Sequence, residues 1–129
     1  MKDTPKRILV IDDEEAIRNS FMLALEDTGY QVDTAASGEK GIELQKDNRY
    51  DLIFLDLKMP GMNGVETLRE LRNIDSAVPI YIVTAFYGEF FDQLRIAEKE
   101  DIDFEIMRKP IGGDGIRLVT RSILEGLGV

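Results

Sequence analysis

Short apolar runs rich in β-branched residues alternate along this chain with longer segments whose apolar residues recur at helical spacing. The short runs predict five strands, at residues 8–11, 31–35, 52–55, 80–83 and 102–107. A segment of helical character follows each run, so the pattern is a strand and then a helix, repeated five times. Such alternation indicates a parallel sheet, because parallel strands are joined by crossover connections outside the sheet.

The apolar spacing also predicts which side of the first helix faces the core. Ile17, Phe21 and Leu25 form a stripe, with Leu23 as a further candidate, and Gly29 is the expected C′ residue that ends the helix.

Later helices are predicted in the same way. Asn63 and Glu66 resemble a capping box that starts the third helix. Its apolar stripe is then formed by Val65, Leu68, Leu71 and Ile74. A fourth helix is expected over about 89–99. A fifth is expected over about 114–124, with Asp114 as its N-cap and with Ile116, Val119 and Ile123 facing inward.

The polarity of the strands predicts their order in the sheet. The first, third and fourth runs are almost wholly apolar, as expected of central strands buried on both faces. The second run contains Gln31, Asp33 and Thr34, which places it at an edge. We therefore expect an α/β fold of flavodoxin-like type, a doubly wound (βα)5 three-layer sandwich with strand order 2-1-3-4-5. Its topological switch point lies between the first and third strands.

Five polar residues stand where the predicted strands end. Asp12 and Asp13 follow the first strand, Asp56 the third, Thr84 the fourth and Lys109 the fifth. The carboxyl ends of parallel strands meet at one edge of the sheet, so these residues should lie together. Carboxylates suit Mg²⁺, and a carboxylate beside Mg²⁺ can attack phosphorus. A hydroxyl and an ammonium can bind phosphoryl oxygens. The pattern predicts a site for a divalent cation and a phosphoryl group.

Each of these residues alone also has a purely structural explanation. Adjacent acids before a helix often cap it, and an aspartate or threonine at a strand end commonly shapes a turn. A lysine before proline commonly lies on the surface. The functional interpretation is favoured because four separate strands end with suitable groups, in an order that makes the relevant strands neighbours.

Composition narrows the classes of function. The 129 residues suit one domain, spanning 1–129, and the net charge of −9 repels nucleic acid and anionic membranes. We expect neither as a direct partner. The chain has no histidine, which excludes a Ser-His-Asp triad, a histidine-ligated zinc site and a phosphohistidine on this chain. It also has no cysteine for disulfides.

The N-terminal apolar run is too short for a signal peptide or a membrane span, so we expect a cytoplasmic location.

The same strand ends carry a resemblance to a known family, the receiver domain of two-component response regulators. The resemblance covers essentially the whole chain. Its specific segments are residues 8–14 (ILVIDDE), 51–64 (DLIFLDLKMPGMNG), 83–85 (VTA) and 109–110 (KP).

This resemblance implies a role for each residue. Asp56 is the implied phosphoacceptor, and Thr84 and Lys109 the groups that hold the phosphoryl oxygens. The implied Mg²⁺ ligands are Asp13 and Asp56 directly, Asp12 through water, and the backbone carbonyl of Lys58.

The implied partners follow from the same family. The donor is a phosphohistidine on a sensor histidine kinase or a phosphotransfer protein. The output is a downstream effector protein or domain, which contacts the face made by the fourth helix, fifth strand and fifth helix. The chain is then a monomer or a phosphorylation-linked dimer. It is not an enzyme beyond catalysing its own phosphorylation and dephosphorylation.

The chain departs from the family pattern near its fourth helix. Ile106 stands where the family has Tyr or Phe, and Phe86 or Tyr87 could substitute. The usual Gly-Ala before the fifth strand is missing. The residues two past the acceptor and two past the threonine tune dephosphorylation in the family. Here they are Lys58 and Phe86, neither of which readily orients water, so we expect slow loss of the phosphoryl group.

Two other functions remain open at this point. One is a degenerate receiver that binds partners without phosphorylation, which the altered region 86–106 motivates. The other is a Mg²⁺-dependent phosphohydrolase similar to the haloacid dehalogenase-like phosphatases. Those enzymes need a second acid two residues after the nucleophile, where this chain has Lys58. Both a stand-alone regulator and a receiver from a longer protein also remain open.

Overall fold

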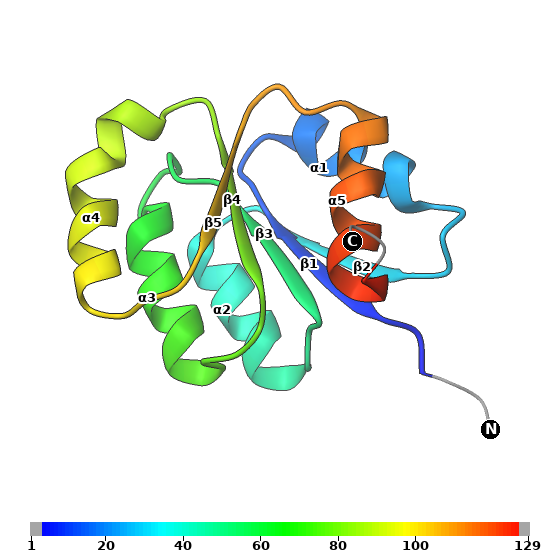
Figure 1. The fold of residues 1–129 in the computed structure, drawn as a ribbon, viewed down its shortest axis with the longest axis horizontal. Coiled ribbons are helices and arrows are strands. Elements are labelled where there is room, and N and C mark those ends of the chain that lie inside the picture. The colour runs from blue at the N-terminus through cyan, green and yellow to red at the C-terminus, as the bar shows by residue number, and fades with distance from the viewer. Residues whose placement is uncertain (1–3, 127–129) are drawn as a thin grey trace.

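A five-stranded parallel sheet forms the centre of the molecule in the computed structural model, which describes residues 4–126 (Figure 1). The strand order is β2-β1-β3-β4-β5, and every neighbouring pair is parallel. The strands are β1 Arg7–Ile11, β2 Gln31–Ala35, β3 Leu52–Leu55, β4 Ile80–Thr84 and β5 Glu105–Arg108. The predicted fold class and strand order are confirmed.

Helices cover both faces of this sheet and complete three layers (Figure 1). One face carries α2, α3 and α4, and the other carries α1 and α5. The helices are α1 Glu15–Leu25, α2 Gly38–Asp47, α3 Gly64–Ile74, α4 Phe91–Lys99 and α5 Gly113–Glu125, and a 3-10 turn, η1 Tyr87–Phe90, leads into α4. Within residues 4–126, none of these helices has the length and apolar character to cross a membrane.

Successive side chains of the central strands fill the two halves of the core. Leu9 and Ile53 face α2–α4, whereas Val10 and Phe54 face α1 and α5. All four are at most 1% exposed. This two-sided burial explains why the central runs are continuously apolar rather than alternating.

The start of α3 fixes the backbone next to the end of β3. Asn63 Oδ1 accepts hydrogen bonds from the amides of Val65 and Glu66, at 2.9 and 3.0 Å, and Glu66 Oε1 accepts from the Asn63 amide at 2.9 Å. The predicted capping box is therefore confirmed. Gly64, which follows Asn63, has to be glycine, because a Cβ on this residue would lie 2.3 Å from the carbonyl oxygen of Asp56.

The first helix differs from its prediction in two ways. Phe21 and Leu25 are buried, but Leu23 is 67% exposed, because it lies about 200° around the helix from either of them. The helix ends at Leu25, whose carbonyl accepts a hydrogen bond from the Thr28 hydroxyl. Gly29 has φ of 86° but lies in the turn toward β2, beyond the helix end.

The third helix buries less of its predicted stripe than expected. Val65, Leu68 and Leu71 are at most 3% exposed, whereas Ile74 is 38% exposed. Ile74 is the last residue of α3, so it projects past the part of the helix that packs on the sheet.

The segments around β5 also begin and end differently from the prediction. β5 starts at Glu105 rather than residue 102, because Asp101 and Ile102 close the C-terminus of α4. α5 starts at Gly113, with Gly112 at its N-cap, so Asp114 lies in the first turn and does not cap the helix. Ile116 is fully buried as predicted, while Val119 and Ile123 pack against the same core cluster and stay partly exposed.

Candidate functional site

Three carboxylates meet at the carboxyl edge of the sheet. Asp12 and Asp13 follow β1, and Asp56 follows the neighbouring strand β3, in which Leu55 pairs with Ile11. One oxygen from each carboxylate lies within 4.8 Å of the others. Asp12 and Asp56 are 3% exposed, whereas Asp13 is open to solvent. The predicted acidic group is thus assembled, with one member reachable from solution.

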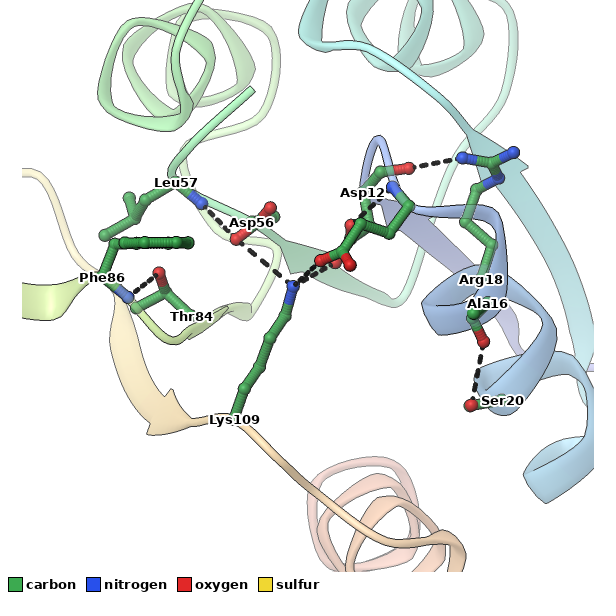
Figure 2. Close-up of polar contacts among 10 residues, drawn as sticks. Asp12, Ala16, Arg18, Ser20, Asp56, Leu57, Thr84, Phe86 and Lys109 are labelled. Carbon is green, nitrogen blue, oxygen red and sulfur yellow. Dashed lines mark hydrogen bonds and ion pairs between the residues drawn. The ribbon is translucent and has the colours of Figure 1, made fainter. Parts of the chain in front are cut away.

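Lys109, at the end of β5, is the cation of this site (Figure 2). Its Nζ lies 2.8 Å from Asp12 Oδ2 and 3.6 Å from Asp56 Oδ1. It also lies 3.4 Å from Glu14 Oε1. The side chain is only 11% exposed, and the Lys109 amide donates to the Thr84 carbonyl at 3.0 Å. The backbone hydrogen bonds between β4 and β5 therefore position the Lys109 ammonium within the acidic cluster.

Local hydrogen bonds orient the buried carboxylates. Asp12 Oδ1 accepts from the Glu14 amide, and Asp56 Oδ1 accepts from the Leu57 amide, both at 2.9 Å. Arg18 donates to the carbonyl oxygen of Asp12 at 2.8 Å. The sequence reasoning missed this contribution of Arg18. Its only signal was that Arg18 is the one cation in α1, the helix that follows Asp13.

Burial and like charge shape the acidity of the cluster. Burial, reinforced by the charge of Asp12, raises the pKa of Asp56 to about 6. Burial likewise raises the pKa of Asp12. Burial alone would lower the pKa of Lys109, but its hydrogen bond to Asp12 and the charge of Asp56 outweigh this, and its pKa is raised. One ammonium cannot balance three carboxylates, so the donor set suits a divalent cation with a preference for oxygen ligands.

Thr84 ends β4 at the same edge and is fully buried. Its Oγ1 accepts a hydrogen bond from the Phe86 amide at 2.9 Å (Figure 2). An open cavity of about 340 Å³ adjoins it, lined by Thr84, Ala85, Tyr87, Gly88, Arg108 and Lys109. Thr84 and Lys109 thus border the same opening beside the acidic cluster.

Lys58 has an exposed side chain in the loop after β3. Its Nζ lies 4.5 Å from the centre of the Phe86 ring and 3.3 Å from Glu89 Oε1. The Lys58 side chain therefore connects the loop that follows β3 with the segment that follows β4.

Comparison with known proteins identifies the family of the chain and agrees with its fold. The model of the response regulator receiver domain matches residues 8–120. The chain belongs to the response regulator receiver family.

Two curated relatives match almost all of the chain. It is 45% identical over 117 residues to the transcriptional regulatory protein AfsQ1 of Streptomyces coelicolor, covering 91% of this chain and 50% of that protein. It is 43% identical over 118 residues to the transcriptional regulatory protein ResD of Bacillus subtilis, covering 92% and 48%. The chain therefore spans about half the length of these relatives.

Solved receiver structures have the same fold. A CheY-like receiver domain protein from Methanospirillum hungatei superimposes with a TM-score of 0.81 at 26% identity, covering 95% of this chain and 96% of that one. A receiver domain protein from Clostridium thermocellum gives a TM-score of 0.78 at 31% identity, covering 94% and 95%.

Proposed function

We propose that this chain, over residues 1–129, is a phosphorylation-dependent switch in which Asp56 accepts a phosphoryl group. The observation that carries the proposal is the buried Asp56 carboxylate beside Lys109 and the Asp12–Asp13 pair, in a chain of the receiver family. Asp56 Oδ1 accepts the Leu57 amide, whereas Oδ2 has no hydrogen-bond partner within residues 4–126. Oδ2 is accordingly the oxygen free to attack phosphorus.

The proposed reaction transfers one phosphoryl group from a phosphohistidine of a kinase or phosphotransfer protein. The bond from Asp56 Oδ2 to phosphorus forms as the phosphorus–nitrogen bond breaks, and the imidazole leaves with a proton from solvent. Lys109 and Thr84 hold the phosphoryl oxygens. Asp13 and Asp56 would ligate Mg²⁺ directly, Asp12 would act through water, and the Lys58 carbonyl would complete the set. When bound, Mg²⁺ neutralises charge on the oxygens being transferred.

The proposed output is a shift between two conformations of the face made by α4, β5 and α5. A downstream effector protein or domain would read this face, with the chain as a monomer or a phosphorylation-linked dimer. The chain itself would act in the cytoplasm, would not bind nucleic acid, and would catalyse only its own phosphorylation and dephosphorylation. The curated relatives AfsQ1 and ResD are named as transcriptional regulatory proteins, which supports an effector in gene control.

The site supports the two alternative functions less well than the switch. A phosphohydrolase of the haloacid dehalogenase type needs a second acid two residues after the nucleophile, and this chain has Lys58 there. The Lys58 side chain contacts Phe86 and Glu89. A degenerate receiver is motivated by the altered region 86–106, in which Ile106 is partly buried against the core where the family has an aromatic residue.

Intact mass after incubation with acetyl phosphate and Mg²⁺ tests the proposal. We expect one added phosphoryl group on the wild type and none on Asp56→Asn. Measurable Mg²⁺ binding without any added mass would reject the switch in favour of a degenerate receiver. Hydrolysis of a small phosphate monoester such as p-nitrophenyl phosphate over many turnovers would instead support the phosphohydrolase.

A further inference from the structure

A row of two aromatic rings and two guanidinium groups runs from β5 across η1 to α4. The guanidinium carbon of Arg108 lies 5.7 Å from the centre of the Tyr87 ring, and that of Arg95 lies 5.7 Å from the Phe91 ring. The two rings meet edge to face, with centroids 5.7 Å apart. We call Arg108, Tyr87, Phe91 and Arg95 the aromatic–arginine row.

The two arginines of the row are available to an incoming anion. The salt bridges found within residues 4–126 involve other cations, and both arginine side chains are exposed. Glu89, the acid closest to the row in η1, pairs with Lys58 at 3.3 Å. A carboxylate brought by a partner would therefore meet two guanidinium groups that no acid of the described chain holds.

The row also offers apolar contacts. Phe91 is 39% exposed, and Tyr87 borders the 340 Å³ cavity that Thr84 and Lys109 also line. Exposed Phe, Tyr and Arg side chains are the types that concentrate at the centres of protein interfaces. An apolar side chain could enter the cavity while its flanking residues lie along the two rings.

We propose that the aromatic–arginine row is the docking surface for an acidic segment of the output partner. Carboxylates of that segment pair with Arg95 and Arg108, and one apolar side chain enters the cavity beside Tyr87. This inference rests on the proposed function and adds to it the chemistry of the partner. The net charge of −9 repels an acidic segment from most of the surface, whereas the two arginines of the row, which contact aromatic rings beside an open cavity, attract it.

Docking at this row is coupled to phosphorylation through shared side chains. Thr84 and Lys109 line the cavity and also belong to the phosphoryl site. A phosphoryl group on Asp56 would draw both toward itself and change the shape of the cavity. Binding free energies are reciprocal, so a docked segment changes the phosphorylation equilibrium by the same factor.

Fluorescence anisotropy with a labelled synthetic peptide tests the docking surface. The peptide contains aspartates and glutamates around one central leucine, and its comparison peptide has alanine in place of the leucine. We expect the Arg95→Gln, Arg108→Gln double variant to bind about tenfold more weakly than the wild type. The matched control, Lys46→Gln with Arg121→Gln, removes two exposed cations outside the row and should bind like the wild type.

Several outcomes would overturn the docking surface. One is an equal loss of affinity in both double variants, which would mean that the peptide senses only overall charge. Another is equal binding of the leucine and alanine peptides. Tighter binding of a single-stranded thymidine oligonucleotide would identify a nucleic acid surface instead. Self-association that the Arg95 and Arg108 substitutions abolish would identify a second copy of the chain as the occupant.

Repeating the titration with acetyl phosphate and Mg²⁺, with intact mass measured in parallel, separates the inference from the proposed function. An added phosphoryl group with a severalfold change in peptide affinity supports the coupling. An added phosphoryl group without any change overturns the coupling. No added mass overturns the proposed function, while selective binding by the unphosphorylated chain would still support the docking surface.

Discussion

Asp56 is kept ionised at neutral pH at a cost to stability in the metal-free protein. Its pKa is raised to about 6, first by burial and then by the charge of Asp12. A carboxyl with a higher pKa in the folded than in the unfolded chain stabilises the fold at low pH, and this contribution is lost as the pH rises through the folded pKa. Asp56→Asn should therefore raise the free energy of unfolding at pH 7.5 by about 2 kcal/mol.

Urea unfolding in the presence of a chelator measures this effect. The advantage of Asp56→Asn should shrink by about half between pH 7.5 and pH 5, because the wild-type carboxyl is then mostly protonated in the folded state. Asp47→Asn, an exposed aspartate at the end of α2, serves as the control and should show a much smaller change. A gain for Asp56→Asn that does not vary with pH would contradict the explanation.

Near Asp56, the proposed phosphoacceptor, Phe86 and Lys58 carry groups that accept no proton from water. Lys58 Nζ lies 4.5 Å from the centre of the Phe86 ring, and Phe86 is 42% exposed. We therefore predict slow decay of the acyl phosphate, and an acceleration of roughly tenfold or more in Phe86→Glu, which places a carboxylate where it can orient water. Intact mass followed over time measures the decay.

Phe91→Glu is the matched control for this prediction. Phe91 is a phenylalanine of similar exposure, at the start of α4 rather than in the loop after Thr84. Its substitution should leave the decay rate near the wild-type value. Rapid decay of the acyl phosphate in the wild type, at a rate that Phe86→Glu does not change, would contradict the prediction.

At the scale of elements, the turn between α4 and β5 stores avoidable strain. Asp101 has φ of 62°, a left-handed conformation that favours glycine. Its amide bonds to the Glu98 carbonyl at 3.0 Å, and the Ile102 amide bonds to the Ala97 carbonyl at 3.1 Å. This is the Schellman arrangement, with Asp101 at C′. Asp101→Gly should stabilise the protein by about 0.5–1 kcal/mol, measured as the urea midpoint.

Asp103→Gly is the comparison for that turn. Asp103 lies two residues further on, is also exposed, and does not have a positive φ. Glycine there should destabilise slightly, because it only adds freedom to the unfolded chain. Similar effects from both substitutions would show that the left-handed conformation of Asp101 costs little.

The same turn shows why the element boundaries could be predicted only in part. β2 and β3 have their predicted bounds, because the strands are short apolar or alternating runs between polar turns. β5 does not, because Ile102 looks like a strand residue in the sequence but forms part of the α4 terminus. A glycine at position 101 would have predicted that α4 ends there, whereas an aspartate at that position does not.

The candidate site was more predictable than the element ends. Asp12, Asp13, Asp56, Thr84 and Lys109 all lie at the predicted edge, because parallel strands bring their carboxyl ends together regardless of loop details. The contacts of loop side chains were not predictable. Those of Lys58 with Phe86 and Glu89 depend on how two loops approach each other, which no local pattern encodes.

On the scale of the whole molecule, the chain has a net charge of −9, and the carboxylates of the acidic cluster repel one another most strongly because they lie closest together. The sheet forces Asp12 and Asp56 together under burial, and Lys109 balances only part of their charge. The folded chain therefore holds carboxylates whose mutual repulsion a bound cation would reduce. A ligand that binds only the folded chain raises its stability by mass action.

Mg²⁺ should consequently raise the melting temperature of the unphosphorylated protein. At a free concentration about a hundredfold above its dissociation constant, the stabilisation is about 2.7 kcal/mol, or roughly 10 °C for a chain of this size. Thermal unfolding with and without Mg²⁺ measures the shift. Asp13→Asn should remove most of it, because Asp13 is the exposed carboxylate of the cluster, whereas Asp47→Asn should not. The shift should also fade at pH 5, because a carboxyl with a pKa of about 6 is then largely protonated and binds the cation poorly. Equal shifts in wild type and Asp13→Asn would place the cation elsewhere.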